Sequence, residues 1–149
     1  MVLEFIKIIN RDLKRLSSEV SAFKNEENLW ATTGKISNSA GNLALHLVGN
    51  LNYYLGAKIG NTGYERDRPA EFSLKNIPRE DLLKQIDQTK EMVSSVLSKV
   101  EDHQLNGEFP EALFGHPMTL GFFLTHLSGH LMYHLGQINY FRRVLESDS

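Results

Sequence analysis

The fold of this chain is decided by one stretch near its C-terminal end, LTHLSGHLMYHLGQINYFRR (residues 124–143). Apolar residues recur in it at steps of three and four, which predicts a helix that Thr119 caps and that reaches about Leu145. Because four residues slightly exceed one helical turn, histidines spaced by four are expected to lie along one side of this helix. The histidines with this spacing are His126, His130 and His134.

Three further helices follow from the same kind of pattern. We expect the first over residues 2–26, the second from N-cap candidates at residues 37–39 to about Lys58, and the third from Pro78 to near Asp102. The second helix is apolar nearly all round, which predicts burial on more than one side. Four long helices without a strand pattern predict an all-α protein, a four-helix bundle.

Two long irregular connections separate the last three helices. The earlier one, residues 59–77, is polar, and a connection of this length within a domain tends to be functional. Since an extended residue spans about 3.3 Å, we expect this connection to cross the bundle rather than form a tight hairpin. The later one, between Asp102 and Thr119, is also irregular.

Composition narrows the class of protein. A chain of 149 residues, 41% of them hydrophobic, predicts a single domain over residues 1–149 with one buried core. A net charge of −2 without charged blocks favours a small-molecule substrate or a protein partner over nucleic acid or a membrane surface. The absence of cysteine excludes disulfides, thiolate ligands and an internal thiol nucleophile. Charges scattered through the first residues argue against a signal peptide, so we expect a cytoplasmic protein.

The histidines favour a metal site. Two of them on adjacent turns have their β-carbons about 6 Å apart, so both imidazoles can reach one ion. His46, in the buried second helix, is the natural third ligand from a facing helix. Imidazole ligands suit zinc, nickel, iron or copper better than calcium or magnesium. The alternative is that these are ordinary histidines satisfied by hydrogen bonds, and spacing by itself leaves both interpretations open.

Polar side chains near His46 are candidates for a substrate pocket. Asn42 and Asn50 lie one turn either side of it, where an amide can orient an imidazole or bind a substrate. The same amides could instead bond water or neighbouring helices. Tyr54, one turn further along this helix, is a third candidate.

Charged residues of the first connection are the remaining pocket candidates. Arg66, Arg68 and Glu71 could line a pocket mouth and recognise a carboxylate or a phosphate. They could equally be solvated, as most charged loops are. Gln137, near the end of the last helix, is expected to belong to helix-end structure rather than to a site.

Two blocks of the sequence resemble the DinB-like superfamily of four-helix metalloproteins. They are NSAGNLALHLVGNLNYYLGAKIGNTGYERDRPAEF (residues 38–72) and the opening stretch, in which HxxxH ahead of LGQI is the most specific element. The chain looks most similar to small, single-domain bacterial members. The resemblance implies up-down-down-up order with long connections after helices two and three, and commonly a homodimer. It also implies a divalent metal held by His46, His130 and His134, with His126 left as a lining residue.

The resemblance also bears on function, since that superfamily includes thiol-dependent S-transferases and proteins described as metal-dependent hydrolases. Our first hypothesis is a transferase in which a divalent ion, zinc or nickel, binds the sulfur of a low-molecular-weight bacterial thiol. Coordination to a cation lowers the pKa of a thiol, so the sulfur becomes a nucleophile at neutral pH. A hydrolase is the close alternative. The histidine blocks hold no carboxylate as an obvious general base, so His126 is the candidate catalytic residue.

The rival hypothesis is a non-catalytic metal-binding module that assembles into a dimer. Extra apolar residues on the last helix could pack against a second copy of the chain. These residues are Phe122, Phe123, Met132 and Phe141.

Overall fold

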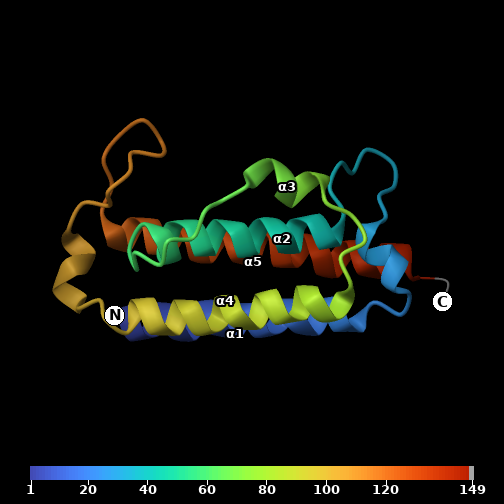
Figure 1. Cartoon of the computed structure of the whole chain (residues 1–149), viewed down its shortest axis with the longest axis horizontal. Coiled ribbons are helices and arrows are strands. Elements are labelled where there is room, and N and C mark those ends of the chain that lie inside the picture. The colour runs from blue at the N-terminus through green and yellow to red at the C-terminus, as the bar shows by residue number, and fades with distance from the viewer. Residues whose placement is uncertain (148–149) are drawn as a thin grey trace.

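Four long helices run side by side along the molecule (Figure 1). The computed structural model describes residues 1–147. The long helices are α1 (Val2–Ala22), α2 (Ala40–Leu51), α4 (Arg79–Leu97) and α5 (Leu120–Leu145). The described residues form no strand, only an isolated bridge between Glu108 and Thr119. The protein is therefore all-α, as expected.

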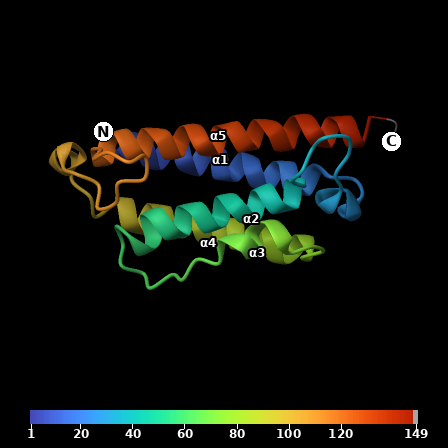
Figure 2. The same cartoon turned by 90° about the horizontal axis from the view of Figure 1, so that it is seen from above.

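The order of the helices is up, down, down, up. Figures 1 and 2 show α1 and α5 running in one direction and α2 and α4 in the other. Helix α1 packs against α4 and α5, and α2 packs against the same two helices, so α1 and α2 lie diagonally opposite. The connection after α2 returns along the outside of the bundle, as its length predicted, and carries a short helix, α3 (Arg68–Ser73), that packs on α2.

Helix α1 ends four residues earlier than the sequence predicted. Phe23 is extended and buried, and a short 3-10 helix, η1 (Glu26–Trp30), follows it with Asn25 as its N-cap. The cause is tertiary: the carboxylate of Glu146, just past α5, accepts hydrogen bonds from the backbone N–H groups of Lys24 and Asn25 at 2.9 and 3.2 Å. These donors are thereby withdrawn from helical bonding.

Helix α4 also stops short of the predicted end near Asp102. It closes at Leu97, and a 3-10 helix, η3 (Asp102–Asn106), follows it. Asp102 serves the neighbouring helix instead, because its carboxylate accepts the terminal amine of Met1 at 2.6 Å and the N–H of Val2 at 2.8 Å. An anionic group at a helix N-terminus satisfies donors that have no partner within that helix.

All twelve residues of α2 are buried, which confirms the expected burial on several sides. Two glycines allow other segments to approach this helix closely. A Cβ on Gly41 would lie 2.7 Å from the ring of Trp30, and one on Gly49 would lie 1.9 Å from the Glu71 carboxylate. The helix continues into one wider π-helical turn, η2 (Asn52–Ala57), a feature often found beside functional sites.

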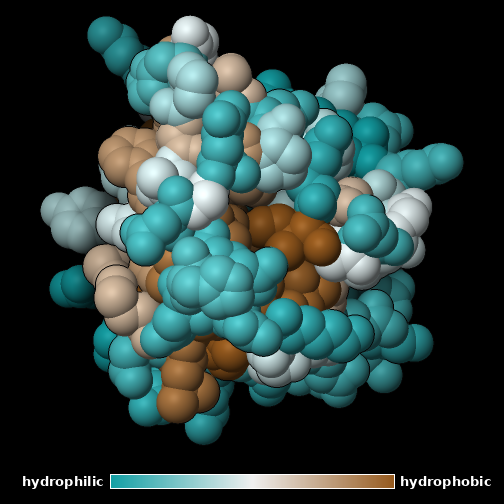
Figure 3. Space-filling model, turned by 90° about the vertical axis from the view of Figure 1, so that its left-hand side faces the viewer, coloured by the Kyte–Doolittle hydropathy of each residue, from teal (hydrophilic) through white to brown (hydrophobic). Residues whose placement is uncertain are grey.

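The core runs between the four helices for the length of the bundle. It is made chiefly of leucine, isoleucine, valine and phenylalanine side chains from all four long helices. At the end of the bundle where the chain passes from α4 to α5, apolar side chains gather in the middle of a polar surround (Figure 3). Within residues 1–147, no helix combines the length and apolar character needed to cross a membrane.

Candidate metal centre

Three histidines meet between α2 and α5. His46 comes from α2, and His130 and His134 come from adjacent turns of α5; one ring nitrogen of each lies within 4.8 Å of the others. The Nε2 atoms of His46 and His130 are 3.1 Å apart. His46 is buried, and the other two are half-buried. The cluster predicted from the sequence is therefore formed, and it could hold a metal ion.

A buried carboxylate orients His46. Glu71 of α3 lies with its Oε1 2.9 Å from Nδ1 of His46, so an Nδ1–H donates to Glu71 and the Nε2 lone pair is directed to the cluster. Arg66 donates to both oxygens of Glu71, at 2.8 and 3.0 Å. Burial by itself would raise the pKa of Glu71, but the hydrogen bonds from His46 and Arg66 hold it below its usual value. Glu71 is therefore an anion in the site.

The contact between Glu71 and His46 was not predicted from the sequence, where Glu71 was a candidate for a pocket mouth or a solvated side chain. The missing element was α3, for which a signal was present: Asp67 caps this helix by accepting from the N–H of Ala70, and Pro69 follows in its first turn. The side chain of Glu71 can reach His46 only because Gly49, three residues further along α2, has no Cβ.

Gln137 orients His134 in the same manner. Its Oε1 lies 2.7 Å from Nδ1 of His134, which leaves Nε2 of that ring free as a ligand atom. The expectation that Gln137 is helix-end structure was wrong, because it lies well inside α5, one turn after His134. Residues three apart on a helix are neighbours, and this spacing could have indicated the contact.

The third imidazole, His130, has no partner for its Nδ1, which is buried. Burial first, and then the neighbouring histidines, lower its pKa from 6.5 to about 3. Burial also lowers the pKa of His134. Both rings are therefore neutral at pH 7, which is the form that binds a metal ion.

The donor set fits a transition metal. Two metal–nitrogen bonds of about 2.0–2.1 Å in tetrahedral geometry hold their nitrogens about 3.3 Å apart. The observed 3.1 Å between Nε2 of His46 and Nε2 of His130 agrees with that spacing. Three imidazoles without an oxygen ligand suit zinc, nickel, iron or copper better than calcium or magnesium. Three protein ligands would leave a coordination position for another molecule.

The asparagine candidates have different roles. The hydrogen bonds that the Asn42 amide donates go to the backbone oxygens of Glu71 and Leu74, at 3.0 and 2.8 Å, and so anchor α3 on α2. Asn50 is buried, with 8% of its surface exposed, and its Oδ1 has no hydrogen-bond partner. Asn42 is therefore a structural residue, whereas Asn50 keeps an open acceptor one turn from His46.

The other pocket candidates are Tyr54 and the two arginines of the connection after α2. The guanidinium of Arg66 is 5.8 Å from the ring of Tyr54, which is half-buried. Arg68 is exposed, and its guanidinium lies 5.4 Å from the ring of Phe72, whose centroid is 5.0 Å from that of His46. The structure thus brings Arg66 and Tyr54 to the site and leaves Arg68 at the surface.

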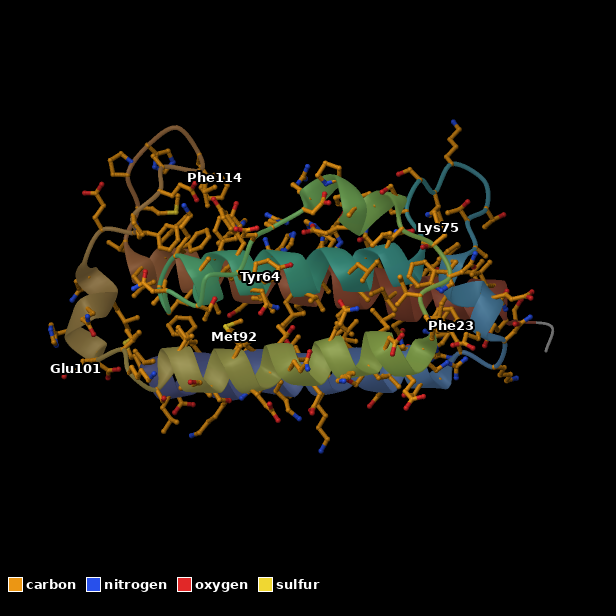
Figure 4. The ribbon with its side chains drawn as sticks, viewed as in Figure 1. Phe23, Tyr64, Lys75, Met92, Glu101 and Phe114 are labelled. Carbon is orange, nitrogen blue, oxygen red and sulfur yellow. The ribbon has the colours of Figure 1, made fainter. Side chains whose placement is uncertain are left out.

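His126 stays outside the cluster. Its ring centroid is 6.2 Å from that of His130, and it is exposed. The ring of Phe114, on the loop before α5, lies edge-on to it at 4.9 Å; this loop rises above the end of the bundle in Figure 4. His126 is therefore a lining residue next to the cluster.

A groove of about 750 Å³ adjoins the cluster at His134. His134 and Gln137 form part of one wall, and Leu43, three residues before His46, forms part of the other. Of the three histidines, His134 lines this groove, so the groove reaches the cluster at that residue.

Comparison with known families identifies a match to most of the chain. The family model of the DinB superfamily matches residues 9–138. This range includes all three histidines of the cluster and the two residues that orient them, Glu71 and Gln137. A comparison with curated proteins found no match.

Proposed function

The chain belongs to the DinB superfamily, and from this premise we propose that it is a metal-dependent enzyme whose ion is held by His46, His130 and His134. One observation carries the proposal: the cluster brings three imidazoles together, and in two of them the second nitrogen is already engaged, by Glu71 and by Gln137. This arrangement is typical of metal-ligating histidines.

We infer that the reaction is transfer of a thiol sulfur to an electrophile. A divalent cation, when bound, lowers the pKa of a coordinated thiol from about 8.5 and so supplies a thiolate at neutral pH. The sulfur forms a bond to the electrophile, and the leaving group departs with the electron pair of the bond that breaks. Because the chain has no cysteine, the thiol comes from a small molecule.

The chain's own residues prepare this chemistry. The Arg66–Glu71 ion pair lies directly behind His46 and fixes the orientation of its ring. Burial keeps His130 neutral and available as a ligand. The groove beside His134 offers room for a small molecule next to the cluster.

The geometry supports a hydrolase less well. Glu71 accepts hydrogen bonds from His46 and Arg66, and its pKa is lowered, so it is a poor proton acceptor. His126 remains the candidate for moving a proton, since it lies beside His130 but outside the ligand set.

A homodimer and a cytoplasmic location stay predictions. The surface assigned to a partner is smaller than the sequence implied, because Phe123 and Phe141 of α5 belong to the buried core. Phe122 and Met132 are exposed. A dimer contact through α5 would use these exposed residues.

Elemental analysis of protein purified without added metal tests the metal proposal. We expect about one divalent ion per chain in the wild type and in His126→Ala, the matched control from the same helix. His46→Ala, His130→Ala and His134→Ala should lose the ion. Unchanged metal content in His46→Ala would contradict the proposal.

The thiol proposal has its own test. Calorimetry of zinc-loaded or nickel-loaded protein against low-molecular-weight bacterial thiols should give binding that the metal-free protein lacks. Conjugation of the bound thiol to 1-chloro-2,4-dinitrobenzene, with release of chloride, then measures transfer. A loaded protein that binds no thiol would exclude the transferase and favour the hydrolase.

A further inference from the structure

The groove beside His134 runs lengthwise along α5. One wall is the part of α5 between Tyr133 and Val144, which spans about 16 Å at 1.5 Å per residue. The other wall is the segment 35–38 together with the first turns of α2. A volume of about 750 Å³ lies in the range of sites for small molecules. The groove is therefore long enough for an extended ligand with one end at the histidine cluster.

The walls are mainly apolar. Tyr133 and Tyr140 are 65% and 69% exposed, and Ile36 is 45% exposed, so large side chains here are left in contact with water. The lining includes no carboxylate among the described residues, and its one cation is Lys35. Such a surface favours a ligand with an apolar body that is neutral or anionic.

Gly136 keeps the wall on α5 open. It lines the groove, and a Cβ built on it would meet nothing within 4 Å. A larger side chain at this position would enter open space beside the groove without displacing the protein. Gly129 also has nothing within 4 Å of an added Cβ and lies on the same helix, but it does not line the groove.

We propose that this groove binds the apolar body of an elongated, neutral or anionic ligand whose electron-pair donor lies at the histidine cluster. The proposal rests on the metal site proposed above and names the class of ligand that the site takes. It follows from the shared wall: His134 belongs both to the cluster and to the groove.

Alkyl hydroxamates of increasing length test this proposal, since their head group chelates a metal and their tail is apolar. With zinc-loaded protein of verified metal content, calorimetry should give an affinity that rises roughly three- to fourfold per methylene from acetohydroxamate to octanohydroxamate. Gly136→Leu should abolish most of this gain and leave the affinity for acetohydroxamate and the zinc content unchanged. Gly129→Leu, the matched control, should behave as wild type.

Three outcomes would overturn the proposal, and they differ from one another. If acetohydroxamate binds but affinity does not rise with tail length, the groove is not the site of the tail, although the metal site stands. If Gly136→Leu changes the oligomeric state by light scattering and tail length has no effect, a second copy of the chain occupies the groove. If the purified protein binds no zinc, the proposed function fails first and this proposal fails with it.

Discussion

Glu71 accepts a hydrogen bond from the Nδ1–H of His46 at 2.9 Å, although 25 residues separate the two in the sequence. The contact joins the short helix α3 to the buried helix α2 and directs Nε2 of His46 toward His130 and His134. The return of the first connection along the bundle thus completes the cluster, because it carries the carboxylate that orients one of the three imidazoles.

Replacing Glu71 by glutamine should weaken metal binding. The amide cannot compensate the charge of Arg66 and holds the ring of His46 less firmly, so we expect about 10- to 100-fold lower affinity for zinc. Competition with a chromophoric chelator measures the change. Glu65→Gln, on the same connection but exposed, is the control and should bind zinc as the wild type does. Equal affinity in Glu71→Gln would show that the contact does not support the site.

Replacing Gly49 by alanine should displace α3. The new Cβ would lie 1.9 Å from Oε2 of Glu71, so the carboxylate must move. We expect the free energy of unfolding to fall by about 1–3 kcal/mol, as in other overpacked sites, together with a loss of zinc affinity. Chemical denaturation measures the first effect. Gly129→Ala, where a Cβ meets nothing within 4 Å, should not destabilise the protein; similar losses in both variants would contradict the account.

The metal-free protein should lose stability as the pH falls below 6.5. The pKa of His130 is about 3 in the folded protein and near 6.5 when the chain unfolds, so between these values only the unfolded chain binds the proton. The pKa of His134 is also lowered in the folded protein, so this residue likewise reduces stability as the pH falls. Denaturant titrations from pH 7 to pH 5 lie above the range in which carboxylates are protonated. His130→Phe should flatten the pH dependence, and a slope equal to that of the wild type would be inconsistent with a buried, neutral His130.

Replacing Glu146 by alanine should destabilise the fold but spare the site. The buried carboxylate accepts hydrogen bonds from the N–H groups of Lys24 and Asn25. The variant removes this acceptor from both donors. We expect a fall of about 1–3 kcal/mol in the free energy of unfolding and unchanged zinc stoichiometry. Thermal unfolding and elemental analysis measure the two quantities. A loss of zinc at temperatures where the variant is folded would argue against the separation of these roles.

The helices that form the cluster were predictable because their patterns are local. The apolar surface of α2 and the four-residue spacing of histidines on α5 are read directly from the sequence, and both helices form where expected. The ends of α1 and α4 were not predictable in this way, since residues near them, Lys24 and Asp102, make contacts across about 100 residues or more. Helix boundaries set by distant side chains are not encoded in local periodicity.

The same contrast between local patterns and distant contacts applies to the site. His46, His130 and His134 were expected together, and their nitrogens do lie within 4.8 Å of one another. The two residues that orient them were missed for different reasons. Glu71 lies on a short helix whose position depends on a glycine of α2, whereas Gln137 is a helical neighbour of His134 that could have been identified from its spacing.

The most direct test of the central claim is an anomalous-difference map of crystals of zinc-loaded protein, collected at the zinc absorption edge. We expect one strong peak between α2 and α5, about 2.0–2.1 Å from the Nε2 atoms of His46, His130 and His134. A peak coordinated by His126 in place of His134, or no peak between these helices, would contradict this claim.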